Sequence, residues 1–389
     1  MGGQLLAGLW RGCRPRSRQE RASALAAHLR GGHMRALVTG ANGLIGANLC
    51  RELLLRECEV RAMTRAGSDR RALHGLALEH VEGDIFDTPA TLAALCAGCD
   101  VVFHAAARFA YSGISAAELD RTALTGTSNM IEAAALAGVG RVVITSSSVV
   151  FGSSTAPVVR DEHGGPDDGF VEPPYIQSKT KQDRLAIALG RERGVEILLA
   201  CPTMSVGPHA TVLGPSNGVI VAYLNDPLRL TYPGGCNIVS VRDVAHGHWL
   251  IATRGTPGES YILGSGNLEW NAIHAAIAAL CGVDSPRLEV NHTAAYLAAS
   301  YEEVRARLQG RAPLTSREQA RMIGRYYWYS HARVAQLGYA PMPARAALAE
   351  ACAWLASSPH ISREVRTSMT LADDAHRARA GMPSTEELQ

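Results

Sequence analysis

Short apolar runs alternate along the chain with longer segments in which apolar side chains recur every three or four positions. The short runs predict buried strands, and the longer segments predict amphipathic helices. The expected strands are Ala36–Thr39, Val60–Met63, Leu78–Glu82, Val101–Phe103, Val142–Ile144 and Ile197–Ala200. The expected helices include Ala47–Arg56, Thr88–Ala97 and Ala116–Ala137. Strands that alternate with helices of this length predict an α/β fold, a parallel sheet covered on both faces.

The pattern loosens after about residue 205, and the chain there predicts a second, smaller lobe. Two short runs, Leu230–Tyr232 and Ser260–Leu263, are expected as return strands. The other periodic segments are helical, over Gly218–Leu224, Trp270–Ala279, Ala294–Leu308, His331–Leu337 and Ala344–Leu355. We therefore expect a sheet domain over residues 34–205 and a mostly helical substrate-binding lobe over 206–357, interleaved with the return strands.

The two ends of the chain differ from the rest. Residues 1–33 carry six arginines against one acid and have no strand pattern, so we expect a disordered N-terminal extension. Residues 358–389 contain the acidic pairs Asp373-Asp374 and Glu386-Glu387 and few large apolar side chains. This composition predicts a surface helix followed by a loose tail.

Composition narrows the class of protein. The 389 residues carry 38 basic and 36 acidic side chains, a net charge of +2, so neither nucleic acid nor an acidic membrane surface is expected as a partner. No apolar run reaches the ~18–20 residues that span a bilayer. Nine scattered cysteines, an odd number, indicate reduced thiols and a cytoplasmic protein, and no metal site is expected. A homodimer is compatible with the sequence.

Three glycines, Gly40, Gly43 and Gly46, follow the first strand at three-residue spacing and directly precede a helical run. Backbone amides at a helix N-terminus, together with the positive end of the helix dipole, bind phosphate groups. A glycine turn in this strand-to-helix context predicts a dinucleotide site. The same turn contains Asn42, Leu44 and Ile45.

The end of the second strand bears on the choice of cofactor. An acid at this point usually binds the ribose hydroxyls of NAD, whereas an arginine accommodates the 2′-phosphate of NADP. Arg65 stands here and no acid occupies 63–66, which favours NADP; NAD stays possible because a loop could return Asp69. Asp84 is expected to hydrogen-bond the adenine edge. The small side chains after His104 leave room for the cofactor backbone: Ala105, Ala106 and Ala107.

Tyr175 and Lys179 lie four residues apart at the start of a helical pattern, and Lys179 is one of only two lysines in the chain. Positions i and i+4 share a helix face, so the phenol and the amine address the same small volume. A nearby cation stabilises phenolate and lowers the pKa of a tyrosine. This spacing therefore predicts Tyr175 as a general acid/base whose pKa Lys179 lowers.

Together these motifs resemble the extended short-chain dehydrogenases/reductases, over about residues 35–357. The resemblance rests on the glycine turn, Asp84, His104–Ala107, the serines 146–148, Tyr175 with Lys179, and on Cys201–Thr203, Val206–Pro208, Val241–Ala245, Tyr261–Gly264 and Leu337–Tyr339. It implies a Rossmann doubly wound parallel sheet, with Ser147 as the catalytic hydroxyl beside Tyr175 and Lys179. It also implies that the cofactor site includes Ile85, Thr145, Pro202, Thr203, Tyr175 and Lys179.

Within this family the chain looks most like dihydroflavonol-reductase-type carbonyl reductases, 3β-hydroxysteroid-dehydrogenase-like enzymes and hopanoid-associated sugar epimerases. Sugar dehydratases of the family carry an Asp-Glu pair after the catalytic hydroxyl, and this chain has Ser148-Val149 there, which argues against dehydration. Epimerases usually retain NAD. Arg65 therefore favours an NADP-dependent reductase of a ketone or aldehyde, with a nucleotide-sugar epimerase as the alternative.

One residue departs from the family pattern. The family commonly has an asparagine three residues before the glycine that aligns with Gly126, and this chain has Ala123. In the family that asparagine is linked to a bound water or a helix distortion near the lysine. The proton relay therefore stays open.

The substrate is the least defined part of the sequence. A cleft between the lobe and the sheet is the expected pocket, and candidate lining residues are Ser148, His209 and Tyr223. Apolar positions hint at a hydrophobic carbonyl or alcohol compound, although they fit an ordinary core equally well: Met204, Val212, Leu213, Val219, Ile220 and Val221.

Overall fold

The computed structural model describes residues 34–107, 114–166, 169–309 and 317–380. The extension expected over 1–33 and the end of the expected tail, 381–389, lie outside the described residues. No helix in the described part of the chain is long and apolar enough to cross a membrane.

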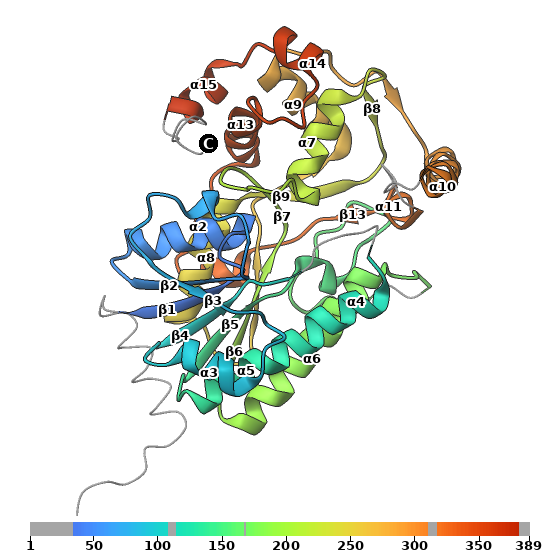
Figure 1. Cartoon of the computed structure of the whole chain (residues 1–389). Helices are drawn as coiled ribbons and strands as arrows, with labels where there is room; N and C mark the ends of the chain where they lie inside the picture. Colours follow the sequence, from blue (N-terminus) through green and yellow to red (C-terminus); the bar gives the residue numbers. More distant parts are fainter. Residues whose placement is uncertain (1–33, 108–113, 167–168, 310–316, 381–389) are drawn as a thin grey trace, which may run out of the picture.

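A seven-stranded parallel sheet forms the centre of the molecule (Figure 1). Its strand order is β10-β6-β5-β4-β1-β2-β3. The bounds are β1 (Arg35–Thr39), β2 (Glu59–Thr64), β3 (Glu79–Glu82), β4 (Val101–His104), β5 (Arg141–Thr145), β6 (Glu196–Pro202) and β10 (Ser260–Leu263). Every residue of β4 and β5 is buried, as expected for central strands covered on both faces. The predicted doubly wound parallel sheet is confirmed.

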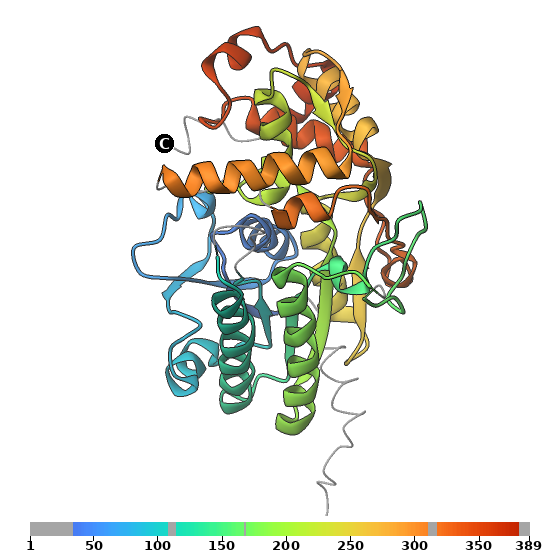
Figure 2. The same ribbon diagram turned by 90° about the vertical axis from the view of Figure 1, so that its right-hand side faces the viewer.

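Helices cover the two faces of this sheet. On one face α2 (Leu44–Leu55) packs against α8 (Val241–Arg254), and on the other α3 (Pro89–Cys96) and α6 (Pro174–Arg193) pack on either side of α5 (Gly126–Leu136). Short 3₁₀ turns follow β2 and β5, at Arg71–Leu73 and Ser148–Phe151. The layers are visible in Figure 1 and, after a quarter turn, in Figure 2.

The long helix expected over Ala116–Ala137 is divided into three parts. It begins as α4 (Ala116–Asp120), continues as a π turn over Arg121–Thr125, and resumes as α5 at Gly126. Ala123 lies in the middle of the π turn. The helix distortion is therefore present here although the family asparagine is missing.

The C-terminal lobe stands above the carboxyl ends of the strands in Figure 1. It contains a second sheet ordered β11-β9-β13, with β7 paired to β9, and a small β12-β8 pair. Its strands are β7 (Met204–Val206), β8 (Leu230–Thr231), β9 (Gly235–Ser240), β11 (Gly266–Glu269), β12 (Leu288–Glu289) and β13 (Tyr326–Tyr327). Its helices are α7 (Pro215–Asn225), α9 (Trp270–Cys281), α10 (His292–Leu308), α11 (Arg317–Arg321), α13 (Ala344–Leu355), α14 (Arg363–Ser368) and α15 (Asp373–Ala380).

Of the two expected return strands, one belongs to the main sheet, whereas the run at Leu230–Tyr232 forms β8, which pairs with β12 in the lobe. β10 pairs in parallel with β6, as its apolar run suggested, and α12 (Ala332–Ala335) packs beside it. The helix α8 and the strand β9 were not predicted. The Asn237 side chain interrupts the apolar pattern of β9, but in the folded protein this amide is fully buried and hydrogen-bonded.

Candidate active site

The glycine turn lies where β1 ends and α2 begins, and its geometry needs glycine. Gly40 has φ +63°, and a Cβ there would lie 2.8 Å from the Cα of Ala106. A Cβ on Gly46 would lie 2.1 Å from the Gly40 carbonyl oxygen. The N-cap Gly43 offers no side-chain acceptor to the first amides of α2. These amides, on Leu44, Ile45 and Gly46, are therefore available to a phosphate group, so this turn fits a dinucleotide.

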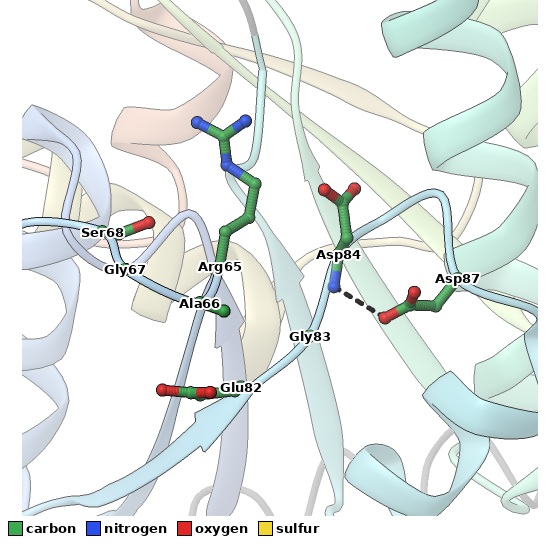
Figure 3. A pocket seen from close by; sticks show the side chains of 8 residues that line it. All are labelled: Arg65, Ala66, Gly67, Ser68, Glu82, Gly83, Asp84 and Asp87. Carbon is green, nitrogen blue, oxygen red and sulfur yellow. Dashed lines mark hydrogen bonds between the residues drawn. The ribbon is translucent and has the colours of Figure 1, made fainter.

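A pocket of about 610 Å³ opens where β2 and β3 end, and it is lined by residues 65–68, 82–84 and 87 of the segments there. Figure 3 shows the Arg65 guanidinium on one wall and the Asp84 carboxylate on the other. The Asp84 carboxylate accepts a hydrogen bond from the Phe86 amide (3.0 Å), and the Asp84 amide donates to the Asp87 carboxylate (2.8 Å). Glu82 is engaged by Arg70. The pocket thus has the Arg65 cation on one side and, on the other, a carboxylate whose orientation is fixed by its hydrogen bond.

The other expected cofactor residues lie along the same sheet edge. The Thr39 hydroxyl accepts a hydrogen bond from the Ala106 amide (3.1 Å), which holds the 105–107 segment against the glycine turn. The Asn42 side chain donates to the Asp69 carbonyl (3.0 Å), and so ties the turn to the loop after Arg65. Pro202 ends β6, and Ile85 packs against Gly126. The Thr203 hydroxyl donates to the Asn237 side chain (2.8 Å).

Ser147 and Tyr175 meet at the carboxyl end of β5. Tyr175 is in the first turn of α6, and its buried hydroxyl lies in hydrogen-bonding contact with Ser147. Burial raises the pKa of Tyr175 well above its ordinary value; the Ser147 hydrogen bond lowers this pKa and the Asp183 carboxylate raises it further. The expected net lowering of the Tyr175 pKa is not found, because desolvation is the largest effect on this group. The contribution of Lys179 to this pKa stays a prediction.

Lys179 lies one turn further along α6, and its amine is directed into the protein. It donates to the Thr145 carbonyl (2.9 Å) and to the Gln182 side-chain oxygen (2.8 Å). Burial lowers the pKa of Lys179 to about 8, while the Asp183 carboxylate raises it. The lysine is thus held by two neutral oxygens and one nearby anion.

Thr145 is held from the opposite face of the sheet by His248 of α8. His248 Nδ1 lies 2.8 Å from the Val244 carbonyl and must be the donor there, so its Nε2 accepts the Thr145 hydroxyl at 3.0 Å. Burial lowers the pKa of His248 to about 4, which keeps the ring neutral. The side chain of Thr145 is therefore a structural anchor, and its carbonyl positions Lys179.

Two functional candidates were missed in the sequence, Gln182 and Asp183. Gln182 is buried and bridges Lys179 to the Thr127 hydroxyl (2.6 Å), which lies on α5 just after the π turn. Asp183 accepts a hydrogen bond from Ser146 (2.6 Å), and its other oxygen is buried without a partner. Burial raises the pKa of Asp183 to about 7, against the lowering effect of Ser146 and Lys179. The spacing 175/179/183 on one helix face was the available signal.

The expected substrate residues do not gather around Tyr175. The Ser148 side chain hydrogen-bonds Tyr329. His209, at φ +66°, packs its ring 5.1 Å from that of Trp354, and burial lowers its pKa to about 3. Tyr223 stacks on His274 inside the lobe, and its hydroxyl donates to the Asp284 carbonyl. Tyr223 is therefore a core residue and not part of the substrate site that we propose.

His104 is the last residue of β4 and is fully buried. Its Nδ1 lies 2.9 Å from the Thr39 hydroxyl, the same hydroxyl that accepts the Ala106 amide. Burial and the nearby Lys179 lower the pKa of His104 to about 3, so the ring is neutral. This agrees with a packed, hydrogen-bonding histidine.

A phosphate-binding turn and a serine, tyrosine and lysine at one edge of a parallel sheet define an NAD(P)-dependent enzyme of the extended short-chain dehydrogenase/reductase class. The chain belongs to the NAD dependent epimerase/dehydratase family, whose sequence profile matches residues 36–264. Enzymes of this class perform oxidoreductase-type chemistry on small molecules.

Similar proteins cover most of the chain. A putative dihydroflavonol 4-reductase of Synechocystis sp. is 30% identical over 84% of this chain and 96% of its own length. Sterol demethylase protein B of Methylococcus capsulatus is 30% identical over 82% and 98%. The crystal structure of gox2253 superposes with a TM-score of 0.73 at 31% identity, over 84% of this chain and 99% of that one.

Proposed function

We propose that this protein is an NADP-dependent carbonyl reductase that converts a ketone or aldehyde to an alcohol. The observation that carries the proposal is the hydrogen-bonding contact between the Ser147 and Tyr175 side chains at the carboxyl end of β5, with Lys179 fixed one turn further along α6. Burial raises the pKa of Tyr175, so the phenol is protonated at neutral pH, as an ordinary tyrosine also is. A protonated phenol is the form that a proton donor needs when a carbonyl oxygen gains negative charge.

In this proposal Ser147 donates a hydrogen bond to the substrate carbonyl oxygen and orients it toward Tyr175. Tyr175 gives its proton to that oxygen. Lys179, fixed by Thr145 and Gln182, keeps a positive charge close to the phenol as it loses the proton. NADP, when bound, supplies hydride chemistry at the neighbouring carbon.

The preference for NADP rests on Arg65 and its surroundings. Arg65 and Ser68 line the same pocket as Asp84, and no described carboxylate forms an ion pair with Arg65. A 2′-phosphate there would meet a cation and a hydroxyl donor. NAD remains the alternative cofactor, in which case Asp69, tied to Asn42 through its carbonyl, would be the nearest acid in sequence.

The substrate class that we propose is a small hydrophobic carbonyl compound. Two relatives, the putative dihydroflavonol 4-reductase and the sterol demethylase protein B, support an apolar substrate by their names. The apolar segment around residue 220 does not, because Ile220 and Val221 belong to the buried core of the lobe. We also propose a cytoplasmic location, since the eight cysteines among the described residues are free thiols.

Replacing Tyr175 by Phe tests the proposal directly. Loss of the proton donor should lower kcat by roughly 10²–10⁴-fold, while the affinity for NADPH changes little because the ring remains. Turnover is followed at 340 nm with a panel of ketones and aldehydes, and NADPH binding is measured by fluorescence. A fully active Tyr175→Phe variant would remove Tyr175 from the mechanism.

The alternative function is that of an NAD-retaining nucleotide-sugar epimerase, which the family match favours as a second candidate. An epimerase reoxidises its own cofactor, so it should carry tightly bound NAD through purification and turn over without added cofactor. The reductase should instead be purified without bound dinucleotide and consume NADPH stoichiometrically. Absorbance of the denatured supernatant, with chromatography of the released nucleotide, separates the two.

A further inference from the structure

Helix α10 carries large apolar side chains on the face that points away from the protein. Their exposed fractions are Leu297 65%, Tyr301 71%, Val304 59% and Leu308 82%. With 3.6 residues per turn, positions i, i+4, i+7 and i+11 lie within roughly 60° of one another around the helix axis. The stripe is therefore continuous over about three turns, which is unusual for a helix face left in water.

The opposite face of α10 accounts for its packing. Small or buried side chains occur there, at Ala295, Ala299, Glu302 and Ala306. Glu303 binds Arg317, with the carboxylate 2.7 Å from the guanidinium, and this pair fixes α10 to α11. The helix is thus anchored through one face, and the apolar stripe on the other face is exposed and accessible to a binding partner.

The charged side chains around the stripe indicate which kind of binding partner it has. Arg305 and Arg307 are exposed and lie about 80° to either side of it. Neither arginine forms an ion pair with a described carboxylate: Glu302 is buried, and Glu303, which also attracts Arg307, is bonded to Arg317. A second copy of α10 would bring more arginines and no outward acid. An anionic lipid surface supplies the missing negative charge.

We propose that the α10 face, Leu297, Tyr301, Val304 and Leu308 with Arg305 and Arg307, docks the enzyme onto an anionic membrane surface. The apolar side chains enter the headgroup region, where tyrosine is also favoured, and the arginines reach the phosphates. This proposal departs from the expectation that the net charge of +2 supports, which was that no acidic membrane surface is a partner, because the local distribution of charge decides surface binding.

The position of α10 fits such a role. Figure 1 shows α10 and α11 at the outer edge of the upper lobe, and Figure 2 shows α10 crossing the outside of the molecule. After α11 the chain reaches Met322, which packs against the same core as Tyr175, and then Arg325, which donates to Ser153 (2.6 Å). A docked enzyme would hold this side of its lobe close to the membrane.

Vesicle flotation with purified protein tests the proposal. Wild type should bind vesicles of phosphatidylcholine mixed with phosphatidylglycerol, and bind vesicles of phosphatidylcholine alone much less. Arg305→Ser with Arg307→Ser should lower the partition coefficient on mixed vesicles roughly 25-fold, about fivefold for each arginine. Leu297→Asp should lower it tenfold or more.

Leu55→Asp is the matched control, since Leu55 is also well exposed, at 77% against 65% for Leu297, but lies on α2. It should bind as wild type does, and all variants should show the same circular dichroism and melting temperature. Equal binding to both kinds of vesicle, or equal binding by Leu297→Asp and wild type, would overturn the proposal. The proposal would also be overturned if wild type did not bind vesicles but formed a dimer, and if Leu297→Asp abolished that dimer. This face would then be a subunit interface.

Discussion

The buried side chains on α6 determine one another's protonation. Tyr175, Lys179 and Asp183 follow at four-residue intervals, and burial shifts each pKa toward the neutral form: upward for Tyr175 and Asp183, downward for Lys179. Between Lys179 and Asp183 the attraction opposes this shift. The acid at 183 therefore supports the charge of the lysine and, at the same time, resists deprotonation of the tyrosine.

Replacing Asp183 by Asn should change how stability depends on pH. Folded Asp183 keeps its proton up to about pH 7, whereas the ordinary value is 3.8, so its contribution to stability falls as pH rises between these values. The Asn variant lacks this fall and should gain stability relative to wild type from pH 5 to pH 7.5. Urea unfolding at both pH values measures the difference.

The control for this change is Asp284→Asn, at an exposed carboxylate paired with Arg287. It should follow wild type at both pH values. The same Asp183→Asn variant should also lose activity at lower alkaline pH than wild type, because the anion that raises the Lys179 pKa is gone. A stability difference that does not vary with pH would mean that Asp183 is ionised throughout this range.

Replacing Arg65 by Asp should change the preference between cofactors. The exchange removes the cation that meets a 2′-phosphate and adds a carboxylate that can bind the 2′-hydroxyl. The ratio of kcat/KM for NADPH over NADH should fall by about tenfold or more, which steady-state kinetics measures. Arg254→Asp on α8, at a surface arginine whose guanidinium contacts the Leu337 carbonyl, serves as the control, and an unchanged ratio for Arg65→Asp would exclude Arg65 from cofactor selection.

Sequence reasoning predicted that Tyr175 and Lys179 lie on one helix face, but it did not predict the direction of the Tyr175 pKa shift. The spacing of Tyr175 and Lys179 follows from helix geometry alone, so it could be predicted. The electrostatic result depends on burial and on Ser146, Ser147 and Asp183, which become neighbours only when β5 and α6 pack together. In the same way, the sequence suggested Tyr223 as a pocket residue because it does not show that the Tyr223 ring stacks on His274 in the folded protein.

At the scale of elements, the π turn between α4 and α5 replaces the expected uninterrupted helix. Gln182 of α6 contacts this region, because its amide nitrogen donates to Thr127 while its oxygen accepts from Lys179. In the family, an asparagine within the π turn would provide this side-chain amide, but in this chain that position is Ala123. The amide near the lysine is thus supplied from the opposite helix.

Removing the Gln182 amide should therefore weaken catalysis more than binding. Gln182→Ala leaves Lys179 with one hydrogen bond and the Thr127 hydroxyl without its partner, so kcat should fall about tenfold with little change in KM. Adding Ala123→Asn should restore part of the loss by returning an amide to the π turn. Steady-state kinetics with the best carbonyl compound of the panel measures both.

Gln177→Ala on the exposed side of the same helix is the matched control and should leave kcat unchanged. If Ala123→Asn gives no recovery, Gln182 does not replace the asparagine. If Gln182→Ala has full activity, the Thr145 carbonyl alone is sufficient to hold the lysine.

Strands and helices with regular apolar periodicity were predicted within a few residues, as for β5 and α9. The missed strand β9 shows why others were not. Its pairing with β7, β11 and β13 comes from segments up to about 90 residues away, and its buried Asn237 breaks the local pattern. Hydrogen bonds to distant segments stabilise this strand, and the local pattern of apolar residues does not predict those bonds.

At the scale of the whole molecule, Asn237 joins the lobe to the main sheet. Its oxygen accepts the Thr203 hydroxyl (2.8 Å) and the Ser265 amide (3.0 Å), and its nitrogen donates to Asn267 (2.7 Å) and to the Tyr329 carbonyl (3.3 Å). Thr203 follows β6 of the main sheet and Ser265 follows β10. The second sheet is therefore attached at the edge where the expected cofactor residues lie.

Asn237→Ala should loosen the whole molecule, not only the second sheet. The change leaves the Ser265 amide without its acceptor and the buried Thr203 hydroxyl with only the longer contact to the Leu263 carbonyl (3.4 Å), which costs about 1–3 kcal/mol of the free energy of unfolding. Since Thr203 is also an expected cofactor residue, the KM for NADPH should rise. Urea unfolding and steady-state kinetics measure the two effects, with Asn271→Ala at an exposed position of α9 as the control. A normal KM together with the expected loss of stability would mean that the second sheet supports the fold without positioning Thr203.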